Sequence, residues 1–122
     1  MKLFITIILI SLSTLFYAQN NVHKNVNVQQ FEKFKTENKV TLLDVRTPKE
    51  FQDGHIEGAK NINYFDKTFK NELAKLDKKT PVYVYCRSGG RSGKAMNIMK
   101  EMGFKTVYNL MGGFISWSKN AK

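Results

Sequence analysis

The sequence predicts an α/β fold in which helices cover both faces of a mostly parallel sheet. Two runs, residues 39–45 and 81–85, carry apolar side chains at successive positions, as strands buried on both faces do. Segments with apolar residues at helical spacing alternate with these runs. Parallel strands need such crossover helices, and their ligands bind at the carboxyl ends of the strands. A chain of 122 residues has room for a single small domain.

The first half of the predicted domain begins with a helix that Asn27 can cap. The apolar run 39–45 follows as a buried strand. Segment 48–53 begins with proline and is followed by glycine, which predicts a short helix, and 59–62 is predicted to be a short strand. The first helix is expected to place three apolar residues on one face: Val28, Phe31 and Phe34.

The second half continues the alternation. Phe51, Phe114 and Trp117 are expected to pack in the core rather than to form a substrate cage. The predicted elements are a helix over 66–76, a strand over 81–85, a helix over 91–102, a strand over 106–110 and a short helix after residue 113.

The first residues of the chain have the composition of a secretory leader. Lys2 precedes an apolar run that is interrupted only by serine and threonine and is short for a membrane span. We expect residues 1–18 to be a signal peptide, 19–26 to be a flexible lead and 27–120 to be the domain. The mature domain would be exported, periplasmic or secreted, without stable membrane association; an uncleaved anchor is the alternative.

Positive charge is abundant but dispersed. The chain has 20 lysines and arginines against 10 acidic residues, a formal net charge of +10, without an aromatic-interleaved basic stripe. This pattern argues against nucleic acid as a partner and favours a solvated surface whose field draws small anions. The single cysteine excludes an internal disulfide, no cofactor or metal is expected, and we expect a monomer.

The only cysteine, Cys86, lies where the second apolar strand ends and a helix follows. Gly89 and Gly90 let the backbone bend so that several N–H groups face inward, forming a nest that favours a thiolate and an anionic substrate. Two of the three arginines, Arg87 and Arg91, flank these glycines, and a guanidinium fork suits anion recognition. The alternative is a buried strand-end cysteine beside arginines that are only surface charge.

Four segments, in this order along the chain, resemble motifs of the rhodanese family of sulfurtransferases. They are residues 42–51 (LLDVRTPKEF), 54–62 (GHIEGAKNI), the Cys86 loop and 112–117 (GGFISW). The resemblance implies a single rhodanese-like domain with a central parallel five-stranded sheet flanked by helices on both faces. It also implies that Cys86 is the nucleophile that forms a persulfide. The loop residues implied to hold the sulfur substrate are Arg87, Ser88, Gly89, Gly90 and Arg91.

The other matched residues are expected to have structural roles. We expect an Arg46–Glu50 ion pair at the end of the strand that contains Asp44, with a catalytic carboxylate at Asp44 as the alternative. His55 is expected to make a structural hydrogen bond rather than to act as a general base, and His23 is expected to have no role. The supporting residues are Asp44, Arg46, Glu50, His55, Gly112, Gly113 and Trp117.

The resemblance implies a thiosulfate sulfurtransferase. A thiol with a pKa of about 8.5 is only about 3% thiolate at pH 7, so we expect the loop to lower the pKa of Cys86 by about two units. The thiolate would take sulfane sulfur from a small anionic donor such as thiosulfate and pass it to cyanide or a thiol. Two alternatives stay open: a persulfide carrier or interaction module without turnover, and a cysteine phosphatase or arsenate reductase. Phosphatase-like loops place five residues between cysteine and arginine, whereas four separate Cys86 from Arg91.

Overall fold

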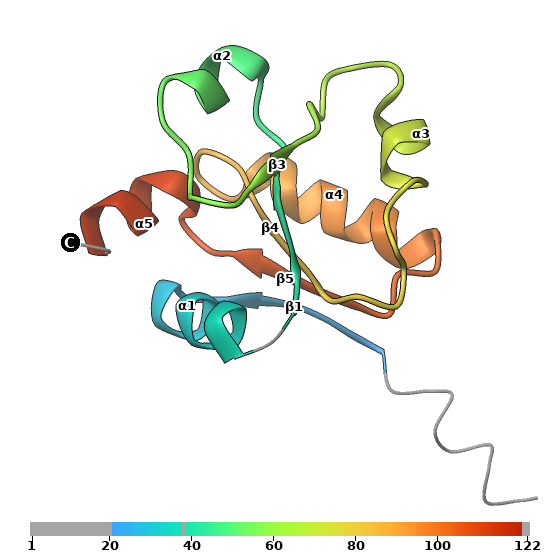
Figure 1. The fold of residues 1–122 in the computed structure, drawn as a ribbon, viewed down its shortest axis with the longest axis horizontal. Coiled ribbons are helices and arrows are strands. Elements are labelled where there is room, and N and C mark those ends of the chain that lie inside the picture. Colours follow the sequence, from blue (N-terminus) through green and yellow to red (C-terminus); the bar gives the residue numbers. More distant parts are fainter. Residues whose placement is uncertain (1–20, 38, 121–122) are drawn as a thin grey trace, which may run out of the picture.

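The computed structural model describes residues 21–37 and 39–120. Five parallel strands form one sheet in the order β1-β5-β4-β2-β3, and helices connect them (Figure 1). The predicted fold class is therefore confirmed. The strands are β1 (Val22–Val26), β2 (Thr41–Asp44), β3 (Lys60–Asn61), β4 (Val82–Tyr85) and β5 (Thr106–Leu110); the helices are α1 (Val28–Glu37), α2 (Pro48–Gln52), α3 (Phe69–Leu73), α4 (Gly90–Glu101) and α5 (Gly113–Asn120).

The central strand β4 explains why its sequence is apolar at every position. Successive side chains of a strand point to opposite faces. Val82 and Val84 pack in a core cluster with residues of α3 and α4, whereas Tyr83 and Tyr85 pack in a second cluster with residues of α1 and α5. None of these four residues is more than 2% exposed. Both faces of the sheet are therefore covered, as the sequence predicts.

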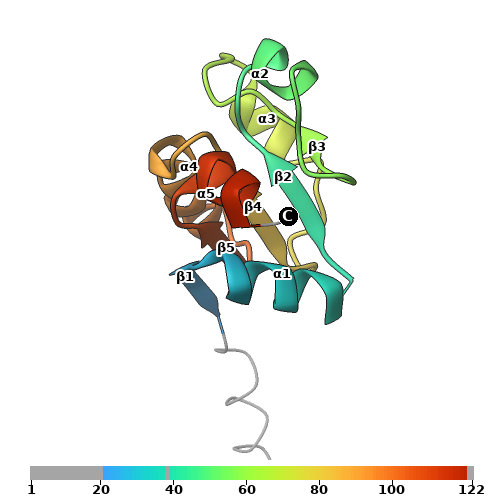
Figure 2. The same ribbon diagram turned by 90° about the vertical axis from the view of Figure 1, so that its left-hand side faces the viewer.

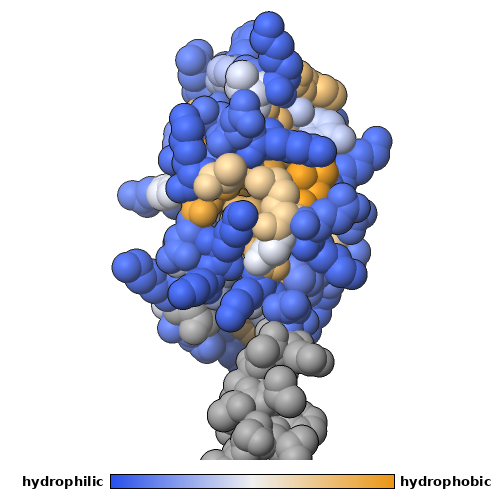
Figure 3. Space-filling model, turned by 90° about the vertical axis from the view of Figure 1, so that its right-hand side faces the viewer, coloured by the Kyte–Doolittle hydropathy of each residue, from blue (hydrophilic) through white to orange (hydrophobic). Residues whose placement is uncertain are grey.

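The two edges of the sheet differ. Figure 2 shows α2 and α3 near β3, while β1 lies at the other edge. The side of the molecule that carries α3 and the end of α4 is mostly hydrophilic, with an apolar patch (Figure 3). Leu76, Ile98 and Met102 pack against the core of this side while staying partly exposed.

Residues 22–26 form β1, so the flexible lead predicted for 19–26 is wrong over this stretch. β1 pairs with β5 in parallel along its length, with Val26 opposite Leu110. Val26 is fully buried, whereas Lys24 is exposed, and this mixture lacks the continuous apolar run of a central strand. Without β1, the backbone groups at the outer edge of β5 would be unpaired.

The domain therefore begins before residue 27. The predicted signal peptide, residues 1–18, lies outside the described residues. Within the part of the chain that the structure describes, no helix is long and apolar enough to cross a membrane.

Caps define where the short helices begin. The predicted cap of α1 is confirmed, because the Gln30 N–H donates to Asn27 Oδ1 at 2.9 Å. Thr47 and Glu50 form a capping box at the start of α2. α3 is shorter than the helix predicted over 66–76: at its start Asp66 accepts hydrogen bonds in a turn that precedes the helix, and at its end Ala74 is the C-cap.

Candidate active site

Cys86 directly follows β4 at the carboxyl edge of the sheet, where the sequence predicts a strand-to-helix junction. The residue is 1% exposed. The Gly89 N–H donates a hydrogen bond to Cys86 Sγ at 3.1 Å, and the Ser92 hydroxyl donates another at 3.3 Å. Gly89 has a φ of +111°, a left-handed conformation that suits glycine in this tight turn. The loop therefore surrounds the sulfur with donors.

These surroundings favour the ionised form of the thiol. Burial alone would raise the pKa of Cys86. Hydrogen bonds outweigh burial and leave this pKa below its ordinary value; the largest comes from the Ser92 hydroxyl, followed by the backbone N–H groups of Ser92, Gly89 and Ser88. Hydrogen bonds to a charged acceptor are stronger than those to a neutral one, so these donors stabilise the nucleophilic thiolate.

Ser92 is the site residue that the sequence analysis missed. It is fully buried on the inner face of α4, together with Ala95 and Met99. The helical spacing of these three residues predicts that Ser92 faces inward. A buried hydroxyl needs a hydrogen-bond partner, and the nearby polar residue Cys86 supplies it. That combination is the signal that could have identified Ser92.

Arg91 is held by Glu50 at the rim of the loop. Arg91 Nη1 donates to Glu50 Oε1 at 2.8 Å, and Nη2 donates to Oε2 at 3.0 Å. The Arg91 guanidinium also lies over the ring of Phe65, with Cζ 5.4 Å from the ring centroid. The hydrogen bond from Arg91 is the largest cause that lowers the pKa of Glu50 to about 2. The fork that was expected to bind an anion is therefore occupied by a carboxylate.

The predicted Arg46–Glu50 ion pair is wrong, because Arg46 pairs with Asp44. Arg46 Nη2 donates to Asp44 Oδ2 at 2.7 Å, and Nε donates to Oδ1 at 3.0 Å; both residues are buried. Arg46 also donates to the Gly54 carbonyl oxygen at 2.7 Å. The i,i+4 spacing of a helix does not apply to Arg46 and Glu50, since α2 begins only at Pro48. Asp44 acts as a structural anchor here, and nothing supports a catalytic carboxylate.

Arg87 is exposed and makes no ion pair within the described part of the chain. The carboxylates described above already neutralise the other two arginines. Arg87 is therefore the guanidinium that can meet an incoming anion. It lines a small pocket beside the loop together with Arg46, Glu50, Asp53, Gly54, Phe114 and Ile115.

The first turn of α5 supports the loop from the other side. The Phe114 N–H donates to the Cys86 carbonyl oxygen at 2.8 Å, and the Ile115 N–H donates to the Arg87 carbonyl oxygen at 3.1 Å. Gly113 has a φ of +57°, and a Cβ atom there would lie 2.5 Å from the Arg87 carbonyl carbon. This close approach explains the glycine, and it supports a structural role for the Gly112–Gly113 pair.

Both histidines make structural contacts. His55 Nδ1 donates to the Phe51 carbonyl oxygen at 2.8 Å, and the two rings stack with centroids 3.7 Å apart. The predicted structural hydrogen bond of His55 is confirmed. His23 is not idle as predicted: its Nε2 lies 2.6 Å from the Phe104 carbonyl oxygen, a contact that became possible because β1 joins the sheet.

The aromatic residues near the terminal helix pack largely as predicted. Phe114 and Trp117 are partly buried against the core cluster of α1 and α5. Trp117 Nε1 donates to Glu32 Oε2 at 3.0 Å, which joins α5 to α1. Phe51 differs from the prediction, because it is partly exposed and stacks on His55.

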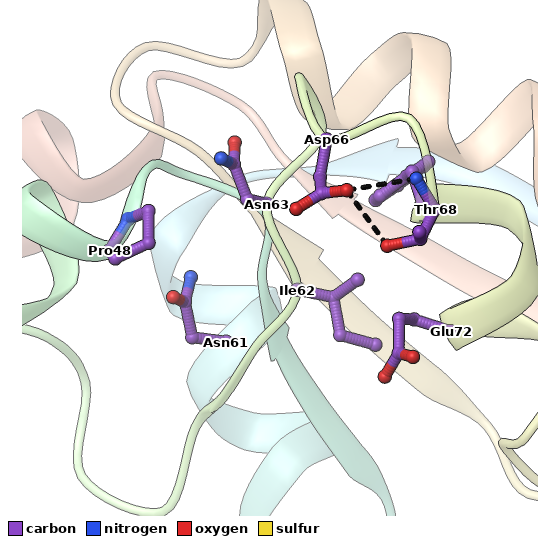
Figure 4. Close-up of a pocket in the computed structure, with 8 residues that line it drawn as sticks. Pro48, Asn61, Ile62, Asn63, Asp66, Thr68 and Glu72 are labelled. Atoms are coloured by element: carbon purple, nitrogen blue, oxygen red, sulfur yellow. Dashed lines mark hydrogen bonds between the residues drawn. The ribbon is translucent and has the colours of Figure 1, made fainter.

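A second pocket lies beside β3 (Figure 4). Its carboxylate Asp66 accepts hydrogen bonds from the Thr68 N–H and hydroxyl at 2.9 and 2.8 Å. Asn61 Nδ2 donates to the Asp44 and Arg46 carbonyl oxygens at 3.0 and 2.9 Å. Local structure thus uses the polar groups of Asp66, Thr68 and Asn61, and no cysteine lines the pocket. Across residues 21–37 and 39–120, no cluster of histidine, cysteine and acidic side chains could hold a metal ion. The pocket is lined by Pro48, Asn61, Ile62, Asn63, Asp66, Thr68, Phe69 and Glu72.

A comparison with protein families matches residues 27–120 to the rhodanese-like domain. The chain belongs to the rhodanese family. The matched region contains all five helices and leaves β1 outside. The family assignment agrees with the resemblance in the sequence.

Several rhodanese relatives resemble this chain over most of the domain. The uncharacterized protein YqhL of Bacillus subtilis is 46% identical over 85 residues, which is 69% of this chain and 65% of that protein. The thiosulfate sulfurtransferase GlpE of Shewanella oneidensis is 33% identical over 94 residues, 77% of this chain and 91% of that protein. A crystal structure of a rhodanese-like domain protein from Staphylococcus aureus superposes with a TM-score of 0.68 at 29% identity, covering 77% of this chain and 90% of the other. The rhodanese family thus includes members named as sulfurtransferases that resemble this chain.

Proposed function

We propose that this rhodanese domain is a sulfurtransferase that moves sulfane sulfur from thiosulfate or a similar donor to cyanide or a thiol through a persulfide on Cys86. The observation that carries this proposal is the buried Cys86 sulfur, which accepts hydrogen bonds from Gly89 and Ser92 at the carboxyl edge of the sheet. The resulting low pKa favours the thiolate that the chemistry needs. The name of the Shewanella relative agrees with this activity.

The proposed cycle has two displacement steps. In the first, the Cys86 thiolate attacks the outer sulfur of thiosulfate, a Cys86 S–S bond forms, and the sulfur–sulfur bond of the donor breaks. Sulfite leaves with the electron pair, and a persulfide anion stays on the protein. In the second, cyanide attacks the outer persulfide sulfur, so thiocyanate leaves and the thiolate is restored. Arg87, which is exposed beside the loop and has no ion-pair partner among the described residues, would hold the anionic donor.

The first test of this function is the intact mass of the reduced domain before and after thiosulfate, with released sulfite measured in the same sample. We expect the mass of one added sulfur and an equal amount of sulfite. Cys86→Ser is the matched control, since it replaces the sulfur with an oxygen of similar geometry and should show neither change. Sulfur transfer by Cys86→Ser would remove Cys86 from the mechanism. A mass gain without cyanide turnover would favour the persulfide carrier instead.

The cellular location and the oligomeric state of the protein are part of the same proposal. We propose that residues 1–18 direct export and that the mature domain acts as a monomer in the periplasm or outside the cell. The apolar run that follows Lys2 supports this location. Intact mass of the protein recovered from the exported fraction tests cleavage after Ala18, and retention of the full chain in membranes would favour the uncleaved anchor. Light scattering of the purified domain tests the monomer.

A further inference from the structure

We infer that Glu50 is a specificity-determining residue of the donor pocket: by neutralising Arg91, it favours monoanionic sulfane-sulfur donors such as thiosulfonates over dianionic thiosulfate. This role rests on the sulfurtransferase function proposed above. It names the charge class of the donor that the same site takes.

Of the three arginines, only Arg87 is left without a carboxylate partner among the described residues. Arg46 is paired with Asp44, and Arg91 is paired with Glu50 through both of its terminal nitrogens. No carboxylate compensates the charge of Arg87, because it makes no ion pair among the described residues. A donor with one negative charge can be matched by Arg87, but a donor with two charges finds no second free guanidinium.

Glu50 also acts on the donor directly, because its carboxylate and Arg87 line the same pocket. Its pKa of about 2 keeps this carboxylate ionised at neutral pH. A second negative charge on the donor would therefore be repelled within the pocket. Asp53 lines the same pocket and adds a further acidic group.

The Glu50–Arg91 pair is fixed from several sides. Glu50 Oε1 accepts hydrogen bonds from the Thr47 N–H at 3.0 Å and from the Thr47 hydroxyl at 3.1 Å. Phe65 lies against the guanidinium of Arg91. An arriving sulfur donor must therefore compete with Glu50 for the Arg91 guanidinium. This guanidinium is already hydrogen-bonded along its edge and covered by Phe65 on one face.

Arg91 is close enough to the sulfur for its charge to matter. The hydrogen bond that Arg91 donates to Glu50 is the largest cause that raises the pKa of Arg91, and the charge of Cys86 contributes to the same shift. Neutralising Arg91 therefore changes the potential at the place where the donor sulfur must arrive. Removing the Glu50 charge should leave the positive charge of Arg91 uncompensated near Cys86.

The test compares two donors that differ in charge in the wild-type chain and in Glu50→Gln. Thiosulfate is a dianion, and methanethiosulfonate is a monoanion with a methyl group in place of one oxygen. Both transfer the outer sulfur to Cys86, and sulfite or methanesulfinate leaves with the electrons of the broken S–S bond. Glutamine keeps an oxygen for the Thr47 N–H and retains the capping box while it removes the charge.

We expect the ratio of kcat/KM for thiosulfate to kcat/KM for methanethiosulfonate to rise roughly tenfold in Glu50→Gln, which corresponds to about 1.4 kcal/mol. Each donor is compared with itself across the two proteins, so the intrinsic reactivity of the donors cancels. Glu72→Gln is the matched control: it makes the same chemical change on α3, where Glu72 pairs with Lys75 at 2.9 Å, away from the Arg87 pocket. An unchanged ratio in Glu50→Gln, or an equal rise in Glu72→Gln, would overturn the inference.

A second readout separates this role from the sulfurtransferase function. Iodoacetamide is neutral and iodoacetate is anionic, and both alkylate the Cys86 thiolate with loss of iodide, without any sulfur transfer. We expect Glu50→Gln to raise the rate with iodoacetate relative to iodoacetamide, under conditions where urea unfolding shows both proteins to be fully folded. If neither donor loads wild-type Cys86 but the alkylation ratio shifts, the proposed function fails and the charge selection by Glu50 stands. If both donors load Cys86 and neither ratio shifts, the function stands and the inference fails.

Discussion

The Phe114 N–H donates a hydrogen bond to the Cys86 carbonyl oxygen at 2.8 Å, so the start of α5 holds the backbone of Cys86. On the other side of the same loop, the Gly89 N–H points at Cys86 Sγ. The start of α5 thus binds the backbone carbonyl of Cys86, while the Gly89 amide of the loop faces the sulfur. The chemistry of Cys86 therefore depends on how closely α5 approaches.

Gly113→Ala should disturb this approach. A Cβ atom would lie 2.5 Å from the Arg87 carbonyl carbon and 2.6 Å from the Cys86 carbonyl oxygen, at a φ of +57°. We expect a loss of about 2–3 kcal/mol in the free energy of unfolding, measured in urea, and slower alkylation of Cys86. Gly103→Ala is the control, because Gly103 has a φ of +94° but no heavy atom within 4 Å of such a Cβ. Equal losses in both variants would mean that backbone conformation, and not the close approach, requires Gly113.

Ser92→Ala should raise the pKa of Cys86. The Ser92 hydroxyl is the largest of the groups that lower this pKa, so its loss moves thiolate formation to higher pH. We expect the midpoint of the alkylation rate against pH to rise by about one unit, since a hydrogen bond to a charged group contributes about 1.5 kcal/mol. Ser88→Ala removes an exposed hydroxyl from the same loop and keeps the backbone N–H, so its midpoint should not move. Equal shifts in the two variants would contradict the special role of Ser92.

The Glu50–Arg91 pair should stabilise the fold in a pH-dependent way. The pKa of Glu50 is lowered from 4.5 to about 2, so its contribution is complete above pH 4.5 and is lost as the pH falls towards 2. We expect Glu50→Gln to be less stable than the wild type by about 1–2 kcal/mol at pH 7, because the pair is partly screened by solvent. Urea unfolding at several pH values should show this difference shrinking between pH 4.5 and pH 2. A constant difference would contradict the assigned pKa.

Asp44→Ala should be strongly destabilising. It leaves the buried Arg46 guanidinium without its carboxylate, and breaking a buried pair in this way costs about 3–5 kcal/mol. Asp53→Ala removes the carboxylate of an exposed pair with Lys49 and should cost less than about 1 kcal/mol. Thermal unfolding of the two variants measures the contrast. Similar, small losses would show that the Asp44–Arg46 pair contributes little to the fold.

The position of Cys86 between a buried strand and a helix could be predicted from the sequence because local signals agree there. The run that ends at Tyr85 is apolar at every position, glycines follow Cys86, and the next segment has helical spacing. β1 could not be predicted in the same way. Val22–Val26 is an edge strand with exposed polar side chains, and its partner β5 lies at the far end of the sequence.

The ion pairs show a similar limit. The spacing along the chain predicts an ion pair between Arg46 and Glu50. However, Arg46 lies before the start of α2, and its side chain pairs with Asp44. Glu50 instead forms an ion pair with Arg91, which the fold places at the rim of the loop that follows Cys86. Sequence spacing predicts contacts within a helix, whereas contacts between separate βα units depend on the packing of the whole sheet.

The common direction of the five strands gives the molecule two functionally different ends. The described chain enters β1 at Val22, at the amino edge of the sheet, while Cys86 lies at the opposite, carboxyl edge. Any attachment upstream of β1, such as an affinity tag or a resin, would therefore hold the domain by the edge opposite Cys86. Protein immobilised through its amino terminus should therefore turn the edge of the sheet that carries Cys86 towards dissolved reagents.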